Sequence, residues 1–322
     1  MLFVRIKYLK VYHHIDEFEG SGNAVVTTGT FDGVHTGHQV IIKRLNEIAV
    51  KENGESVLLT FYPHPRMVLF PDDIDLKLLT TQEEKIRLLE NYGVKHLIIH
   101  PFTKEFSRLS SLQFIREILV NKIKTRKLVI GYDHHFGRNR EGSFEHLKET
   151  GPVYGFTVEE IPAQDVDHMA VSSTKIRHAL QEGDVKTARE FLGHDYTLTG
   201  KVIHGEKKGH ELGYPTANVA VESRYKLIPA IGIYAVRAEV EGIIYDGMLY
   251  IGYRPTLNGK YQSIEVNIFD FDRDIYGKQI TVYFKSRIRD DIKFDSLDEL
   301  KKQLASDKSM AINLLKNTEN NF

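Results

Sequence analysis

The chain has 322 residues, enough for two domains that each bury a hydrophobic core of ordinary size. Its 43 Lys and Arg balance 44 Asp and Glu, so bulk charge does not favour nucleic-acid or membrane binding, and an anionic ligand requires a local arrangement of groups. The absence of cysteine excludes disulfides, thiolate metal sites and thiol nucleophiles.

The first residues carry interspersed charge and no sustained apolar core, so they do not resemble a signal peptide. No apolar run approaches the roughly 20 residues that span a bilayer. We therefore expect a soluble, cytoplasmic protein.

From residue 23 onward, apolar runs alternate with segments of helical period, which is typical of a parallel sheet with crossover helices. Helices are expected around 40–49, after the capping-box pattern of Thr81 and Glu84, and around 112–119. Strands are predicted at 24–28, 56–62, 95–100 and 127–132. This half is predicted to form an open α/β sheet.

After residue 196, β-branched and aromatic runs are separated by Gly, Pro, Asn and Asp instead of helices. This pattern predicts an antiparallel sheet or small barrel, followed by a helical region over 295–315 that starts at Ser296 with a capping-box spacing to Glu299. The predicted strands are 233–240, 247–252, 263–269 and 279–284. We place the domains at 1–185 and 186–322.

The segment GTFDGVHTGH, residues 29–38, joins the first strand to its helix. A helix that begins near Thr36 puts His35 and His38 at its N-terminus, where free N–H groups and the helix dipole favour an anion. A metal site using the histidines and Asp32 is a weaker alternative because its ligand set is incomplete. A glycine turn with solvated histidines is the third interpretation. The phosphate cradle fits these residues best.

A second segment, SSTKIR at residues 172–177, precedes a helical pattern. Its hydroxyl residues could simply cap that helix. Alternatively, Thr174 and Arg177 supply a hydroxyl and a guanidinium group to phosphate oxygens. An arginine at a helix start opposes the dipole, so a bound anion would account for its position.

These two motifs, together with FYPHP at 61–65 and GYDHHFGRNREG at 131–142, resemble the FAD synthetase half of the prokaryotic bifunctional riboflavin kinase/FAD synthetase family. The resemblance implies a Rossmann-like nucleotidyltransferase domain in which His35, His38 and Arg177 act on the phosphates of ATP. It differs from the family pattern at Tyr62, where Asp is common, and at Asp133, where Asn is common. The resemblance further implies ATP or phosphate binding by Gly29, Phe31, Gly37, Ser173 and Thr174, and flavin binding by Phe61, Asp133 and Phe136.

The adenylyl-transfer chemistry implied by this resemblance needs no general base. The phosphate of FMN is already ionised and can attack the α-phosphorus of ATP directly. The protein has to position two polyanions and neutralise the charge that develops, which histidines, a helix terminus, an arginine and Mg²⁺ can do.

The segment 200–219 contains four glycines and then PTAN at 215–218. It could be a glycine-rich hairpin with a proline-initiated turn. It could also be a phosphate loop, in which Lys207 or Lys208 supplies charge and Thr216 and Asn218 supply oxygen ligands to Mg²⁺. Its glycine spacing is not that of a Walker A loop.

Glu265 lies in SIEVNIFDF, residues 263–271, on the same face of the predicted strand as Asn267. PTAN, IGYRPT at 251–256, this strand and IRDDIKF at 288–294 together resemble the riboflavin kinase module. The resemblance implies a small β-barrel with Glu265 as the catalytic base, and it differs from the family at His210, where Arg is usual, and at Asp291, where Glu is usual. It also implies ATP binding by Gly205, Lys207, Gly209 and Gly213, metal binding by Thr216 and Asn218, and flavin binding by Arg289 and Asp291.

We therefore expect an enzyme that uses ATP and Mg²⁺ to phosphorylate riboflavin to FMN and to adenylylate FMN to FAD. Its expected partners are small molecules, with no nucleic acid or membrane, and it is expected to be a monomer or a weak homo-oligomer. Two alternatives remain: an enzyme active in only one step, and a catalytically dead flavin- or nucleotide-sensing protein. Binding alone would not require Glu265, which argues against the sensor.

Overall fold

The computed structural model describes residues 9–73, 75–132, 134–162, 171–205, 209, 212–256 and 259–317. The chain forms two compact units. The first contains residues 1–76 and 82–172, and the second contains residues 77–81 and 173–322. The short segment 77–81 thus belongs with the C-terminal part of the chain. The functional boundary after residue 185 stays a prediction.

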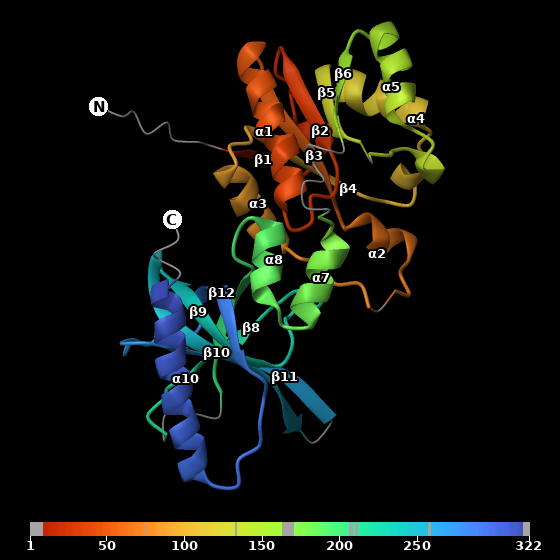
Figure 1. Ribbon diagram of the computed structural model, residues 1–322. Helices are drawn as coiled ribbons and strands as arrows, with labels where there is room; N and C mark the ends of the chain where they lie inside the picture. The colour runs from red at the N-terminus through yellow and green to blue at the C-terminus, as the bar shows by residue number, and fades with distance from the viewer. Residues whose placement is uncertain are drawn as a thin grey trace, which may run out of the picture. The chain divides into compact units, whose positions relative to one another are not determined.

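The first unit is built on a six-stranded parallel sheet with the strand order β1-β4-β3-β2-β5-β6 (Figure 1). The four predicted strands are β2 to β5, so the open parallel sheet is confirmed. The two edge strands were not predicted, because one is very short and the other is only partly buried. The strands are β1 (Lys10–Tyr12), β2 (Ala24–Thr28), β3 (Glu55–Tyr62), β4 (His96–Pro101), β5 (Thr125–Gly131) and β6 (Thr157–Ile161).

The central strand β2 is buried along its whole length. Val26 packs into the core on one side of the sheet, while Val25 packs with Leu45 of a covering helix on the other. A strand covered on both faces has a continuous apolar sequence, which is why the sequence identified it.

Helices cover the sheet of the first unit (Figure 1). The helix expected around 112–119 is present, but most of it is a π-helix that follows a capping box formed by Ser110 and Gln113. The helices are α1 (Thr36–Lys51), α2 (Pro65–Leu69), α3 (Gln82–Asn91), α4 (Ser111–Gln113), the π-helix η3 (Phe114–Lys122) and α5 (Phe144–Thr150). Short 3₁₀ segments are η1 (Ile15–Glu17), η2 (Phe106–Arg108), η4 (Arg138–Arg140) and η5 (Gly151–Tyr154).

The strand order reverses direction between β2 and β5. From β2 the chain proceeds outward to β3 and β4, and from β5 it proceeds outward to β6 on the other side. In open α/β sheets a crevice forms at the carboxyl ends of the strands at such a switch point, and ligands bind there. The segment after Thr28 lies at this point.

The second unit contains a closed six-stranded barrel with the order β10-β11-β8-β7-β12-β9 and antiparallel neighbours. The predicted small antiparallel barrel is confirmed, and β9 to β12 are its predicted strands. Two further strands flank the glycine-rich segment. The strands are β7 (Thr197–Ile203), β8 (Ala217–Ala220), β9 (Gly232–Val240), β10 (Ile243–Thr256), β11 (Gly259–Ile268) and β12 (Gln279–Arg289).

In the part of the second unit that the structure describes, the helices are α7 (Ser173–Gln181), α8 (Val185–Leu192) and the C-terminal α10 (Leu297–Asn317). In α10, Ala311 and Leu315 pack on Met248 and neighbouring barrel residues. The amide of Glu299 donates a 3.2 Å hydrogen bond to Ser296 Oγ, which confirms the predicted start of this helix.

Candidate active sites

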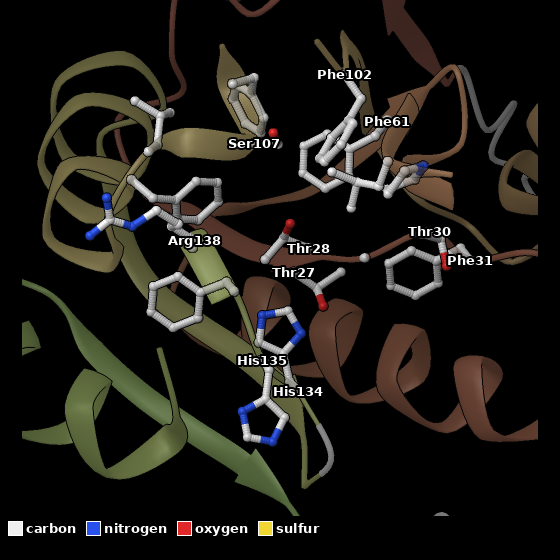
Figure 2. Close-up of a pocket in the computed structure, with 18 of the residues that line it drawn as sticks. Thr27, Thr28, Thr30, Phe31, Phe61, Phe102, Ser107, His134, His135 and Arg138 are labelled. Atoms are coloured by element: carbon white, nitrogen blue, oxygen red, sulfur yellow. The ribbon is translucent and has the colours of Figure 1, made fainter. Parts of the chain in front are cut away.

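A cavity of about 800 Å³ lies in the first unit at the switch point of the sheet (Figure 2). Figure 2 shows Thr27 and Thr28 from the end of β2 between aromatic side chains on one side and Arg138 on the other. Five predicted ligand-binding residues line this one cavity. They are Gly29, Phe31, His38, Phe61 and Phe136.

The turn between β2 and α1 holds two non-glycine residues in the left-handed region, Phe31 at a φ of 47° and Val34 at a φ of 42°. This conformation is costly, especially for a β-branched residue, and it persists only where the surroundings impose it. The carbonyl oxygen of Thr30 accepts a 3.2 Å hydrogen bond from Thr60 Oγ1 and a 2.8 Å bond from Lys85 Nζ. These two bonds hold the turn at the floor of the cavity.

The two histidines lie at the start of α1, as the sequence predicted. His35 is the N-cap residue, but its side chain does not cap the helix. Its ring stacks on that of His38, with centroids 3.7 Å apart and an interplanar angle of 17°. Gly37, which lies between them in the sequence, is buried.

The imidazole of His38 is held neutral. Burial, followed by the charges of His35 and Lys85, lowers the pKa of His38 well below its usual value. Its Nδ1 is buried and has no hydrogen-bond partner within the described part of the chain. A neutral ring with an open nitrogen can accept or donate one hydrogen bond to a ligand.

Aromatic side chains form the other wall of the cavity, which suits a flat conjugated ring. Phe61 contacts Phe102 and Phe106 with ring centroids 5.7 and 5.4 Å apart, and Phe136 contacts Phe114 at 5.4 Å. The predicted Asp133 lies outside the described residues. Sequence reasoning did not single out some lining residues, among them Phe102, Ser107 and Arg138. Phe102 follows β4, whereas Ser107 and Arg138 lie in the short 3₁₀ segments η2 and η4, and only the fold brings these segments together.

The SSTKIR residues Ser173, Thr174 and Arg177 lie on α7 and belong to the second unit. Arg177 Nε donates a 2.7 Å hydrogen bond to the carbonyl of Lys77, in the short segment 77–81 of the same unit. Their action together with His35 and His38 stays a prediction.

In the barrel, β11 and β8 bring Glu265 opposite Asn218 in the antiparallel register. Glu265 Oε2 accepts a 3.3 Å hydrogen bond from Thr216 Oγ1, and Oε1 accepts a 2.7 Å bond from Ser263 Oγ. The structure therefore brings the predicted base and both predicted metal ligands together. Ser263 was missed, although its position two residues before Glu265 puts it on the same strand face.

The glycine-rich loop lies directly against these residues. A Cβ on Gly205 would come within 2.1 Å of Asn218 Nδ2, and a Cβ on Gly209 within 3.3 Å of Thr216 Oγ1. At Gly205 only glycine allows this approach, because a Cβ would overlap the Asn218 side chain. Gly213 adopts a φ of 84° and has open space at its Cβ position. Lys207 and His210 lie outside the described residues.

Two cavities adjoin this cluster. One, of about 600 Å³, is lined by Gly205, Asn218 and Ser263, together with basic residues that include Lys226. The other, of about 460 Å³, is lined by Thr216 and by the segment 271–276. The cluster thus borders two separate spaces.

The predicted flavin residues at the end of β12 are tied to other elements. Arg289 forms a bidentate contact with the buried carboxylate of Asp307 on α10, with bonds of 2.9 and 2.7 Å. Asp291 accepts a 3.1 Å hydrogen bond from Tyr250 Oη, and Tyr250 lies opposite Glu265 in the barrel register. Asp307 and Tyr250 gave no recognisable signal in the sequence.

No helix in the described residues is long and apolar enough to cross a membrane. Among those same residues, no group of three or more His, Cys, Asp or Glu side chains is placed to hold a metal ion.

Comparison with known proteins gives matches over both units. Residues 18–175 match the family model of FAD synthetase, and residues 192–315 match that of riboflavin kinase. The chain is 38% identical over 310 residues to a bifunctional riboflavin kinase/FMN adenylyltransferase of Bacillus subtilis, covering 95% of this chain and 96% of the relative. It is 36% identical over 309 residues to the protein of the same description from Escherichia coli, covering 95% and 97%.

A crystal structure from Streptococcus pneumoniae, described as that of a macrolide-efflux protein, has a TM-score of 0.85 and 34% identity, covering 95% of this chain and 99% of that one. Both family models and the relatives from Bacillus subtilis and Escherichia coli agree on a different description. The chain belongs to the bacterial family of bifunctional riboflavin kinase/FMN adenylyltransferases, enzymes of FAD biosynthesis that carry both activities on one chain.

Proposed function

We propose that the two activities are divided along the chain, with FMN adenylylation in residues 1–185 and riboflavin phosphorylation in residues 186–322. The observation that carries this proposal is the hydrogen-bonded cluster of Glu265, Thr216 and Ser263 in the barrel, opposite Asn218. A carboxylate so placed suits a kinase, whereas the cavity of the first unit offers histidines and aromatic rings.

For the kinase reaction, Glu265 would accept the proton of the riboflavin 5′-hydroxyl. As it loses its proton, the 5′-oxygen of riboflavin attacks the γ-phosphorus of ATP. The bond between the γ-phosphorus and the β–γ bridging oxygen breaks, and ADP leaves. The hydrogen bonds from Ser263 and Thr216 orient the carboxylate and keep its two oxygens distinct. The two cavities that border this cluster offer separate spaces for the two substrates.

The oxygen donors of this cluster fit Mg²⁺. Thr216 Oγ1 and the Asn218 carboxamide are hard ligands next to a carboxylate, and Mg²⁺ in kinases takes few protein ligands and completes its shell with phosphates and water. When bound, the ion would neutralise charge on the phosphates of ATP. Gly205 and Gly209 allow the loop backbone to approach the same place.

For adenylyl transfer, an ionised phosphate oxygen of FMN attacks the α-phosphorus of ATP, and pyrophosphate leaves. The start of α1, with His35, His38 and Gly37, would hold the ATP phosphates together with Gly29 and Phe31, and the hydroxyls of Ser173 and Thr174 and the guanidinium of Arg177 would close on them. Phe61 and Phe136 would stack or pack against the flavin ring. The described geometry does not favour an enzyme that is active in only one step. The first unit has the paired rings of His35 and His38, and the barrel has the hydrogen-bonded Glu265.

The test supplies riboflavin, ATP and Mg²⁺ to the purified full-length chain and separates FMN and FAD by chromatography. Formation of both products is expected, and a second reaction with FMN in place of riboflavin isolates the adenylyl step. Failure of both reactions, with flavin binding retained, would favour the sensor. Light scattering in the same buffer tests the proposed monomer or weak homo-oligomer. We also propose a cytoplasmic location, where the co-substrate ATP is available.

A further inference from the structure

Lys85 is a buried lysine beneath the phosphate-cradle turn that neither the motifs nor the proposed chemistry uses. It lies on α3, its residue is 6% exposed, and its Nζ donates a 2.8 Å hydrogen bond to the Thr30 carbonyl. A buried ammonium loses much hydration free energy, so its retention requires partners that interact strongly with it.

The charges around Lys85 connect it to both the turn and His38. Asp32, only 3% exposed, favours the charged ammonium, although burial has the larger effect and lowers the pKa of Lys85 to about 8. The positive charge of Lys85 in turn contributes to the lowered pKa of His38, after burial and His35. Of these groups, only His38 lines the cavity. The other basic or titratable residues that line the same cavity are Arg108, His134, His135 and Arg138.

We propose that Lys85 is a positioning residue for adenylyl transfer. Its ammonium binds the Thr30 carbonyl and faces the charge of Asp32, which fixes the strained turn between Phe31 and Val34. Its charge adds to burial and to the charge of His35, which have the larger effects, in keeping the His38 ring neutral. His38 can then offer a hydrogen bond of fixed direction to a phosphate oxygen. This inference rests on the proposed role of His38 as a phosphate contact.

The first experiment follows His38 directly by NMR titration of the full-length chain with isotope-labelled histidine, assigned with His38→Asn. In Lys85→Met the pKa of His38 is expected to rise by about one unit, the size of effect that one neighbouring charge produces. Lys43→Met removes an exposed charge from α1 of the same unit and is expected to leave the titration unchanged. An unchanged His38 titration in Lys85→Met overturns the proposal.

Lys85→Gln separates position from charge, because the amide can still donate to Thr30 while the charge is lost. It is expected to raise the pKa of His38 as Lys85→Met does. If Lys85→Met does not fold, the NMR titration is made with Lys85→Gln instead. Lys85→Arg keeps the charge and is expected to leave His38 near its native titration.

Kinetics give the second readout, with the kinase activity of the same chain as an internal control. Lys85→Met is expected to lower kcat for FMN adenylylation about 10- to 100-fold and to move the acidic limb of its pH profile upward, with riboflavin phosphorylation unchanged. Equal loss of both activities, or an unshifted acidic limb, contradicts the proposal. If His38→Asn leaves adenylylation intact while the titration shifts as expected, the proposed role of His38 fails and the coupling to Lys85 stands.

Discussion

Thr216 Oγ1 donates a 3.3 Å hydrogen bond to Glu265 Oε2, across 49 positions of sequence. One hydrogen bond thus joins a predicted metal ligand to the predicted catalytic base. Ser263 binds the other carboxylate oxygen, so both oxygens of Glu265 have defined partners before any substrate binds. Such preorganisation lowers the cost of aligning a base with a hydroxyl group.

Replacing Glu265 with Gln should abolish riboflavin phosphorylation and spare adenylylation of supplied FMN. The amide keeps the shape of the side chain but cannot accept the hydroxyl proton, and loss of a general base costs about 10²- to 10⁴-fold in rate. Product formation from riboflavin and from FMN is measured separately by chromatography. Glu241→Gln, on the same barrel but hydrogen-bonded to Lys278, is the control and should keep both activities. Equal loss of both reactions in Glu265→Gln would rule out separate sites.

Replacing Gly205 with Ala should weaken the kinase through Asn218. The added Cβ would come within 2.1 Å of Asn218 Nδ2, so that side chain must move away from its place opposite Glu265. We expect a higher Mg²⁺ requirement for FMN formation and unchanged adenylylation. Gly22→Ala, where a Cβ meets open space, is the control. A normal Mg²⁺ titration of the kinase in Gly205→Ala would show that Asn218 does not serve the metal.

Replacing His38 or Arg177 with Ala should impair only the adenylyl step. Each change removes a proposed hydrogen-bond donor to the phosphates, and the loss of one such donor costs about 10²- to 10³-fold in kcat. Steady-state kinetics with FMN and ATP measure the effect. Arg177→Lys keeps the charge but loses the Nε bond to the Lys77 carbonyl. Its kcat for adenylylation should lie between that of the native chain and that of Arg177→Ala. An Arg177→Ala variant with native adenylylation would remove α7 from this site.

Replacing Asp307 with Asn should destabilise the second unit. The carboxylate is fully buried and pairs with Arg289, so its loss leaves a guanidinium without its counter-charge, at a cost of about 3 kcal/mol or more. Urea denaturation compares the variant with Asp298→Asn, an exposed change on the same helix. Because Arg289 anchors the proposed flavin segment, the KM for riboflavin should also rise. A native denaturation midpoint would show that the pair contributes no net stability.

Stability should fall in mild acid because of His100, at the carboxyl end of β4. Burial first, then the charge of His14, lowers the pKa of His100 to about 4, although Asp16 opposes this shift. The unfolded chain takes up this proton near pH 6.5 and the folded chain does not, so the contribution is complete above pH 6.5 and declines toward pH 4. The loss is about 3 kcal/mol.

The variant His100→Gln tests this pH dependence, since glutamine does not titrate. Denaturation at pH 7, 6, 5 and 4 should give a shallower decline for the variant than for the native chain. His13→Gln provides the control, because His13 lies outside β4. This variant should show the same decline of stability with falling pH as the native chain. Parallel curves for the native chain and His100→Gln would exclude His100 as the cause.

Much of the fold could be predicted because many of its strands have recognisable local sequence patterns. The buried strands β2 to β5 have largely apolar sequences, and β9 to β12 are runs rich in β-branched and aromatic residues that turn-forming residues separate. The edge strands β1 and β6 were missed, because a short or half-buried strand has too few apolar positions to form a pattern. The π-helical turn over Phe114–Lys122 was also unpredictable, since its apolar spacing matches that of an ordinary helix.

The sequence by itself predicted the two reactions and the family, both of which the comparisons confirm, and it indicated which residues should carry the chemistry, because glycine-rich turns, the His35–His38 spacing and Glu265 lie in contiguous motifs. The tertiary structure alone decided how those residues are held. Lys85 under Thr30, Thr216 on Glu265, and Asp307 on Arg289 are contacts between segments that are separated in sequence. Such contacts depend on strand register and helix packing, which local spacing does not encode.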